Sequence, residues 1–213
     1  MDFSFTAEQD AVRAVARDVL AGSPSMQELE EQGWIGIESS ASFLEAAVIF
    51  EEIGRALYEG PYVENEVGDD RRKLLAAYAL EAVGIGSHVV ELAVAYVSER
   101  EQFGKKIGTY QAVSHAIVNA YVAVELARSL AYWAAWCVAT GDAQIDLACA
   151  AAKSQATEAA VLASETAIQV HGGIGFTWEH PLHRYYKRAL WLDAALGHGR
   201  EHRAEIAQFL LSS

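Results

Sequence analysis

Three short segments combine cationic, amide and glycine residues in a pattern that suits binding of an anionic ligand. They read SEREQFGKKIG over 98–108, QAVSH over 111–115 and QVHGGIGFTWEHP over 169–181. Arg100 offers bidentate donors, and the two glycines that follow it let backbone amides approach a phosphate. Taken singly, an arginine beside a helix-ending glycine is also typical of a surface ion pair. The glycine run, taken singly, is also typical of a tight turn between helices. The prediction therefore depends on the combination.

The charge balance limits the partners of such a site. The formal net charge is −13, and because a phosphate backbone repels an acidic surface, we expect no nucleic-acid partner. An anionic small molecule would need a local cluster of cations. Five residues could supply one: Lys105, Lys106, Arg184, Lys187 and Arg188.

Metal and thiol chemistry are not expected. Cys137 and Cys149 lie in apolar helical surroundings, far from other ligand residues in sequence, which predicts two buried thiols. His180 and His183 are three residues apart, but Pro181 between them and Arg184 beside them disfavour a metal site. Packing of these histidines against aromatic residues is the alternative.

The elements that position these segments are predicted to be helices. Apolar residues make up 52% of the 213 positions and prolines number three, a composition that favours helix. A first helix is expected over 7–20, with Thr6 as its N-cap and Gln9 in the capping-box position. A short helix follows over 25–32 and a third helix over 42–57. Four long helical regions come next, over 71–101, 109–139, 143–171 and 181–211.

Long helices joined by short turns predict an all-α protein built on an antiparallel four-helix bundle. We expect an N-terminal helical domain over 1–62, an acidic solvated linker over 63–70 and the bundle over 71–213. No strand is predicted. The small residues of 148–163 would allow close helix contacts, either inside the bundle or at a subunit interface.

The sequence favours a cytoplasmic protein without a membrane span. Its first fifteen residues contain early acidic side chains and no apolar run, unlike a signal peptide. Charged residues interrupt each apolar stretch, so no bilayer-crossing segment is expected.

The order and spacing of the three segments resemble the C-terminal helical domain of the acyl-CoA dehydrogenase family, closely over 71–193. GWIG at 33–36 and EEIGRAL at 51–57 resemble the first, helical domain of the same family. The stretch GFTWEHP at 175–181 is similar to an actinobacterial branch, some of whose members act on steroid side-chain CoA esters. The resemblance implies FAD bound at a subunit interface, α-proton abstraction from an acyl-CoA thioester and transfer of a β-hydride to the flavin.

By this resemblance, seven residues are expected to hold FAD. Arg100, Gln102 and Phe103 would contact the flavin nucleotide of the adjacent subunit, and Gln111 corresponds to the glutamine of the family's Q-A-V motif. A further glutamine and two glycines complete the set, at Gln169, Gly172 and Gly173.

The chain departs from the family pattern in three places. The glutamate base of one branch would fall at Gly197 and that of another at Leu74, and neither residue can accept a proton. Asp193 is the acid closest to Gly197, and Glu179 in the third segment is expected to be structural. The family's middle β-domain would lie between Val63 and Arg71, where this chain has only a few residues. A Gly-rich loop of the family's first domain is shortened here to residues 38–41.

These departures predict a subunit without a catalytic residue of its own. We expect an α2β2 acyl-CoA dehydrogenase in which a second subunit of the family supplies the base and the β-domain. Its substrate would be a bulky or ring-bearing acyl-CoA, and the electron acceptor stays open. Two alternatives remain: a self-sufficient homo-oligomer whose base is Glu179 or Asp193, and a flavin-free structural or regulatory helical subunit.

Overall fold

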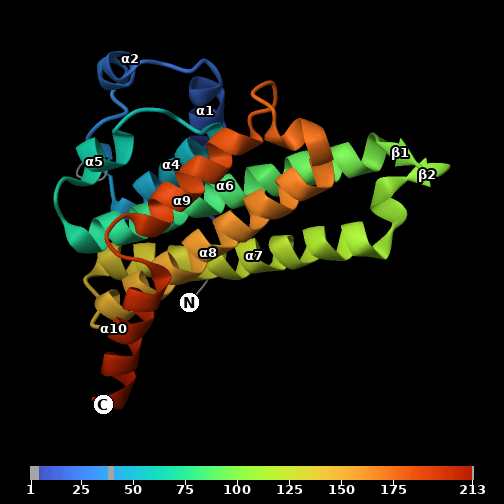
Figure 1. Cartoon of the computed structure of the whole chain (residues 1–213). Coiled ribbons are helices and arrows are strands. Elements are labelled where there is room, and N and C mark those ends of the chain that lie inside the picture. Colours follow the sequence, from blue (N-terminus) through green and yellow to red (C-terminus); the bar gives the residue numbers. More distant parts are fainter. Residues whose placement is uncertain (1–4, 38–40, 213) are drawn as a thin grey trace.

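A computed structural model describes residues 5–37 and 41–212. The shortened loop expected at 38–41 falls mostly outside these residues. Helices dominate the described chain (Figure 1). They are α1 (Ala7–Ala21), α2 (Met26–Glu31), α4 (Phe43–Ala56), α5 (Tyr62–Val67), α6 (Arg71–Glu99), α7 (Gln111–Thr140), α8 (Ile145–His171), α9 (Leu182–Ala194) and α10 (Gly199–Leu211), with 3-10 helices η1 (Ile107–Thr109) and η2 (Gly172–Phe176) and strands β1 (Glu101–Gln102) and β2 (Lys105–Lys106).

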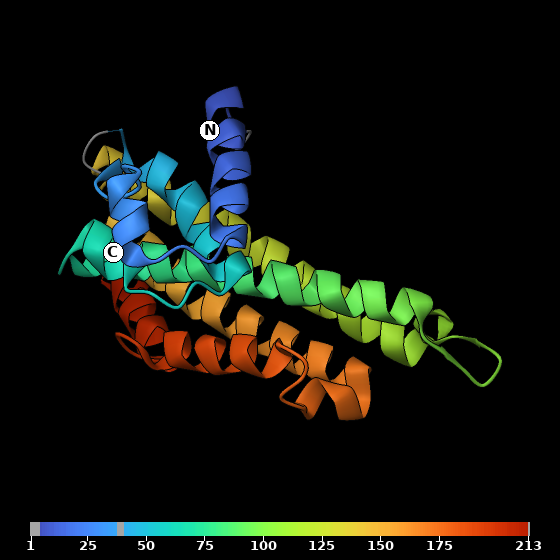
Figure 2. The same ribbon diagram turned by 90° about the horizontal axis from the view of Figure 1, so that it is seen from above.

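The bundle of α6, α7, α8 and α9 confirms the predicted fold class. α8 packs against the other three, and its buried face consists mainly of alanines between Ala148 and Ala167. Small side chains let neighbouring helices approach closely, so the small-residue stretch serves the interior of the bundle. Figures 1 and 2 both show the α6–α7 pair extending beyond the other helices and ending in the β1–β2 hairpin.

The N-terminal helices pack on the bundle and share one apolar core with it. Thr6 caps α1, and its reciprocal bonds with Gln9 form the predicted capping box. α4 crosses α6 at two facing glycines: a Cβ built on Gly54 would lie 1.9 Å from the Glu81 carbonyl oxygen, and one on Gly84 equally close to that of Glu51. Only glycine permits backbones to meet this closely.

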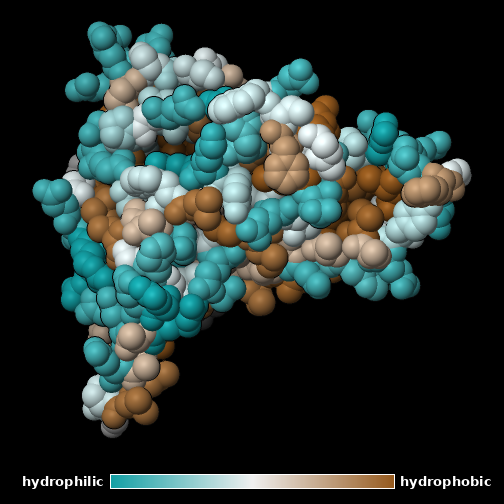
Figure 3. Space-filling view, viewed as in Figure 1, coloured by the Kyte–Doolittle hydropathy of each residue, from teal (hydrophilic) through white to brown (hydrophobic). Residues whose placement is uncertain are grey.

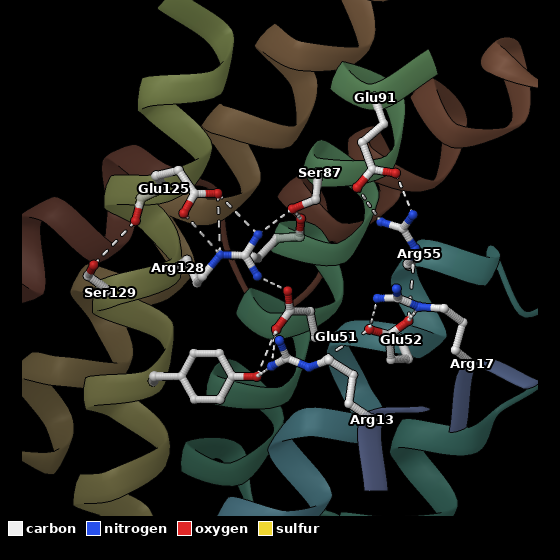
Figure 4. Close-up of polar contacts among 12 residues, drawn as sticks. Arg13, Arg17, Glu51, Glu52, Arg55, Ser87, Glu91, Glu125, Arg128 and Ser129 are labelled. Atoms are coloured by element: carbon white, nitrogen blue, oxygen red, sulfur yellow. Dashed lines mark hydrogen bonds and ion pairs between the residues drawn. The ribbon is translucent and has the colours of Figure 1, made fainter. Parts of the chain in front are cut away.

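Charged side chains bind α1 and α4 to α6 and α7 (Figure 4). Glu51, buried on α4, accepts bonds from Arg13, Tyr132 and Arg128. Its neighbour Glu52 accepts two bonds from Arg17 at 2.7 and 3.0 Å. Further pairs complete the network, namely Arg55 with Glu91 and Arg128 with Ser87 and Glu125. Glu51 and Glu52 are thus each matched by a guanidinium, as burial of charge requires.

The prediction of a solvated linker is wrong, because residues 62–67 form helix α5 and several of its side chains are buried. Tyr62 donates to the Trp34 carbonyl at 2.6 Å, Glu66 accepts from the Gly36 amide at 2.7 Å, and Glu64 accepts from Tyr78 at 2.8 Å. The acidic residues are therefore anchors of a packed segment. The division into domains at this point stays a prediction.

Three further expectations need correction. The tip of the α6–α7 pair contains the antiparallel strands β1 and β2, although no strand was predicted. The last helical region is divided in two, because Leu196 and Gly197 have φ values of +61° and +108° and end α9. Within the described residues, α6 and α7 are long and apolar enough to cross a membrane, contrary to the sequence argument. Core helices pass the same test, and 61% of the relevant stretch of α6 is buried.

Candidate functional site

The tip of the α6–α7 pair carries the first group of predicted residues. α6 ends at Glu99, and β1 pairs with β2 so that Gln102 lies opposite Lys105. Phe103 and Gly104 form the turn with φ of +54° and +80°, the positive values that a tight hairpin turn requires at both positions. Phe103 is 93% exposed in this left-handed conformation, which is uncommon for a residue other than glycine. The hairpin therefore presents an aromatic ring to solvent.

Exposed polar side chains lie on the hairpin and at the start of α7. Arg100, Gln102 and Gln111 are all exposed. Among the described residues, none forms an ion pair with the Arg100 guanidinium, and the Gln102 side chain bonds only to the adjacent carbonyl, at 2.7 Å. Lys105 lies over the Tyr110 ring at 4.1 Å, and this cation–π contact stiffens the turn. The tip thus offers cationic and amide donors that the chain itself leaves for another molecule.

The second group lies at the end of α8, where the chain enters η2. Gln169 is exposed, and a Cβ at Gly172 or Gly173 would meet no atom within 4 Å. These glycines leave open space in front of the backbone, which fits the approach of a large polar ligand. His171 is buried here and stacks on Tyr96 of α6, with ring centroids 4.3 Å apart. This stack joins the end of α8 to the base of the tip and so brings the two groups to the same end of the bundle.

Apolar surface accompanies both groups. Phe176 and Trp178 follow the glycine turn and are 74% and 83% exposed. Farther down α7, Val118, Tyr121, Val122 and Leu126 form an exposed stripe. Figure 3 shows hydrophobic atoms reaching from the bundle toward the tip between hydrophilic borders. Exposed apolar surface of this kind marks an interaction site.

The predicted cation cluster is smaller than the sequence indicated. Arg188 forms two hydrogen bonds to buried Glu81, and Arg184 pairs with Glu59. Lys187 lies 4.7 Å above the Trp178 ring. Lys105 and Lys106 lie at the tip near Arg100 in the chain, whereas Arg184 and Lys187, although exposed, are engaged elsewhere on α9.

The two positions where the family's base would fall, Gly197 and Leu74, hold no carboxylate. A side chain at Gly197 would be strained at its φ of +108°, and its Cβ would lie 2.8 Å from a Glu201 carboxylate oxygen. Leu74 lies in the first turn of α6 with an apolar, partly buried side chain. Glu179 is exposed next to Trp178. Asp193 is engaged on both carboxylate oxygens, accepting from His198 at 2.8 Å and from Thr157 at 3.1 Å.

The structure also places polar residues that sequence reasoning missed. Lys153 is fully buried in α8 and bonds to the carbonyls of Asp193 and Gly197, at 3.4 and 3.3 Å. Burial lowers the pKa of this lysine to about 8, although the nearby Asp193 acts in the opposite direction. A lysine within a run of alanines was a visible signal, since a buried cation needs acceptors around it. His198 is bonded to Asp193. In the sequence, only the glycines on either side of His198 indicated a special position for it.

Neither the two cysteines nor the neighbouring histidines indicate a metal site within the described residues. Both cysteines are buried thiols, as predicted, and burial raises the pKa of Cys149 to about 12. A search of residues 5–37 and 41–212 finds no group of three or more side chains that would hold a metal ion. His180 packs against His171 and His183 against Trp178, which agrees with aromatic packing.

Comparison with known sequences finds one family over most of the chain. The family described as "Acyl-CoA dehydrogenase, C-terminal domain" matches residues 72–211. Acyl-CoA dehydrogenase FadE34 of Mycobacterium tuberculosis is 41% identical over 144 residues, which cover 66% of this chain and 20% of that protein. Acyl-CoA dehydrogenase IpdE2 of Mycolicibacterium smegmatis is 36% identical over 66% of this chain and 44% of its own length. The chain thus spans less than half the length of these relatives.

Solved structures show the same fold. Butyryl-CoA dehydrogenase from Megasphaera elsdenii matches 66% of this chain and 36% of its own, with a TM-score of 0.63 and 28% identity. A chain of the ChsE4-ChsE5 complex from Mycobacterium tuberculosis matches over 100% of both chains, with a TM-score of 0.88 and 15% identity. A chain from a variant of the Tcur3481-Tcur3483 steroid ACAD gives a TM-score of 0.85 at 15% identity, covering 96% and 98%. At this identity, the last two comparisons establish the fold.

Proposed function

Since this chain belongs to the acyl-CoA dehydrogenase family, we propose that it is an FAD-binding subunit of a heteromeric enzyme that dehydrogenates an acyl-CoA thioester between its α- and β-carbons. One observation carries the proposal: the seven residues predicted to bind FAD are exposed on the hairpin, at the start of α7 and at the η2 turn, toward one end of the bundle. They are Arg100, Gln102, Phe103, Gln111, Gln169, Gly172 and Gly173. Their polar groups have few partners among the described residues.

The residues of this end fit FAD. The cofactor combines an anionic diphosphate, polar sugar groups and planar rings. Arg100 supplies a charged donor for phosphate, Gln102, Gln111 and Gln169 supply amide donors and acceptors, and Phe103 supplies an aromatic face. The space in front of Gly172 and Gly173 allows a phosphate to reach the backbone. When bound, FAD supplies the hydride acceptor of the reaction, and this chain's residues fix its position and exclude water.

The residues at the tip are exposed, so a second subunit would be needed to enclose a cofactor there. The described part of this chain contains no β-domain beyond the two-residue strands of the hairpin. Family enzymes remove the α-proton with a carboxylate, and the candidate positions Gly197 and Leu74 hold none. The base for the flavin at the tip therefore comes from the partner subunit, together with the cover for the ring. An α2β2 assembly satisfies both requirements.

Two likenesses support the heteromer. The matched chain in the ChsE4-ChsE5 complex has the same extent as this one, so a chain of this size and fold occurs in a two-component assembly. The Tcur3481-Tcur3483 protein is named a steroid ACAD. Together with the similarity of GFTWEHP to the actinobacterial branch, this favours a bulky or ring-bearing acyl-CoA substrate.

Flavin content is the direct test. The chain is expressed alone and with a candidate second subunit of the family, and FAD is measured by its visible spectrum after purification. We expect flavin bands on co-expression, and R100A should lower flavin per complex about tenfold or more, since a charged hydrogen bond contributes about 1.5–3 kcal/mol. R71A is the matched control, because Arg71 is exposed at the opposite end of α6.

Three results would point elsewhere. Full flavin retention in R100A would remove the tip from the cofactor site. A colourless, catalytically silent complex would favour a structural or regulatory subunit. Flavin binding and bleaching by acyl-CoA in the lone chain would favour a homo-oligomer with its own base.

A further inference from the structure

Helix α7 is long, apolar and poorly covered by the rest of the chain. It spans Gln111–Thr140, about 45 Å at the helical rise. Only 33% of its apolar stretch is buried, against 61% of that of α6. Its two charged residues are Glu125 and Arg128, and the Arg128 guanidinium bonds to Glu125 at 3.2 Å and to Ser87 at 2.7 Å. In a chain of net charge −13, such a helix surface is exceptional.

Five exposed residues of this helix form what we term the α7 face. They are His115, Val118, Val122, Leu126 and Ser129. Their steps of three, four, four and three residues place them on one side of the helix. Val118, Val122 and Leu126 are 52%, 46% and 60% exposed. In Figure 1, α7 forms the lower edge of the bundle toward the tip. An exposed apolar surface of this kind marks an interaction site.

The spacing of the α7 face is the same in both directions from Val122. In an antiparallel helix pair related by a two-fold axis, a residue before the axis lies beside the residue equally far after it. With the axis at Val122, Val118 of one copy lies beside Leu126 of the other, and Val122 lies beside its own counterpart. A smaller apolar side chain thus meets a larger one. At the ends of the face, the imidazole of His115 meets the hydroxyl of Ser129.

A groove beside Val118 suits the larger of these side chains. Val94 and Val97 of α6 line it together with Ile117 and Val118 of α7. Because Leu126 of the second copy lies beside Val118 in this arrangement, its longer side chain can enter the groove. The two-fold axis repeats the contact at the other end of the face, so each copy both offers a groove and fills one.

Charge selects a second copy of this chain as the occupant. Two chains of net charge −13 repel each other unless the surfaces that meet carry little charge. The α7 face contains no Asp, Glu, Lys or Arg. A lipid surface with anionic headgroups attracts clusters of Lys and Arg, which this face does not offer. An unrelated protein partner would not require spacing that is symmetric about one residue.

We propose that two copies of this chain pair through the α7 face, antiparallel across a two-fold axis at Val122. The pair would provide the two like subunits of the α2β2 assembly, and this part of the inference rests on the proposed function. The β1–β2 hairpin and the η2 turn lie outside the α7 face. Pairing and flavin binding can therefore be tested separately.

The mass of the full chain in solution tests the pairing. Size-exclusion chromatography with light scattering is applied to the chain expressed alone, and we expect the wild type at twice its chain mass of 23.1 kDa. V122E puts two carboxylates against each other at the axis, so it should raise the dissociation constant at least about 100-fold and give the monomer mass. V15E is the matched control, because Val15 of α1 is 52% exposed and lies outside the face.

Paired substitutions test the antiparallel register. V118K and L126E should each weaken the dimer, because each sets a charge against an apolar side chain of the other copy. In the V118K/L126E variant, the new ammonium of one copy lies beside the new carboxylate of the other at both ends of the face, so the dimer mass should return. Within one chain these positions are eight residues apart, or about 12 Å, which is too far for a direct ion pair.

Cross-linking identifies the occupant in the assembled enzyme. The chain carrying V122C is expressed with the candidate second subunit and treated with a short bismaleimide. Cys137 and Cys149 are buried, so the introduced thiol should be the one of this chain that reacts. We expect a product that contains two copies of this chain, and none from V15C. A product joined to the second subunit, or no product from V122C, would overturn the pairing.

The remaining outcomes separate the pairing from the cofactor assignment. A monomeric wild-type chain, a dimeric V122E chain with its fold intact by circular dichroism, or a V118K/L126E chain that stays monomeric would overturn the pairing. A wild-type complex without flavin, in which V122C still links two copies, would uphold the pairing and defeat the proposed FAD-binding role. Flavin lost in R100A, with the dimer mass of the lone chain unchanged, would uphold both.

Discussion

Replacing Arg188 with methionine should expose how strongly one buried charge depends on its partner. Glu81 lies in the middle of α6 with 2% of its side chain exposed, and Arg188 of α9 donates to both of its carboxylate oxygens, at 2.6 and 3.0 Å. Burial raises the pKa of Glu81, and Arg188 opposes that shift. R188M removes the opposing cation and leaves a desolvated carboxylate without its guanidinium.

The expected loss follows from this geometry. Breaking a buried ion pair on one side costs about 3–5 kcal/mol. In a domain of this size each kcal/mol moves Tm by about 2–4 °C, so R188M should melt roughly 10 °C lower. The double variant R188M/E81M removes both charges, and since apolar replacement of a buried pair is often neutral, it should recover most of the loss.

The pH dependence has a defined sign. A carboxyl whose folded pKa is raised contributes stability below its unfolded pKa, and that contribution is lost as the pH rises through the folded pKa. R188M raises the pKa of Glu81 further, so its deficit should be largest near pH 7 and shrink as the pH approaches about 4.3, the ordinary glutamate value. Urea unfolding at several pH values measures this. A deficit under about 1 kcal/mol at pH 7, or one that grows in acid, would refute the reasoning.

Three further changes test the packing. G84A should lower the free energy of unfolding by about 3 kcal/mol or more, because its Cβ would lie 1.9 Å from a backbone oxygen of α4. Gly22 is exposed, so the control G22A should change the free energy of unfolding by about 0.5 kcal/mol or less. T6A should cost about 1 kcal/mol and speed amide exchange in the first turn of α1, and unchanged exchange would contradict its capping role. Cys149 should resist iodoacetamide at pH 8 until urea unfolds the chain, because burial raises its pKa to about 12; rapid labelling of the folded protein would show that this thiol is accessible.

The long helices were predictable because their signals are local and repeated. Residue periodicity and composition located α6, α7 and α8, and the Thr6–Gln9 pair predicted the start of α1 to the residue. The order of the three motifs gave the family. These features depend on neighbours within a few positions in the chain, which is the range over which a sequence pattern is informative.

The missed features depend on contacts between distant residues. The acidic composition of α5 predicts a solvated linker, yet Glu64 accepts a hydrogen bond from Tyr78 and Glu66 accepts one from the Gly36 amide. The β1–β2 strands have two residues each, too few to show any alternation. The break after α9 followed from Leu196, whose positive φ has no signal in its side chain, although Gly197 beside it did mark a possible turn.

The candidate functional residues also divide into those predicted from the sequence and those found only in the structure. The residues expected to hold FAD came from motif resemblance, and the structure places them together at one end of the bundle because α6 and α8 end there side by side, joined by the Tyr96–His171 stack. The Asp193–His198 pair came from the structure alone. Its two residues are separated by a helix break that sequence reasoning did not predict, so their hydrogen bond could not be inferred from spacing.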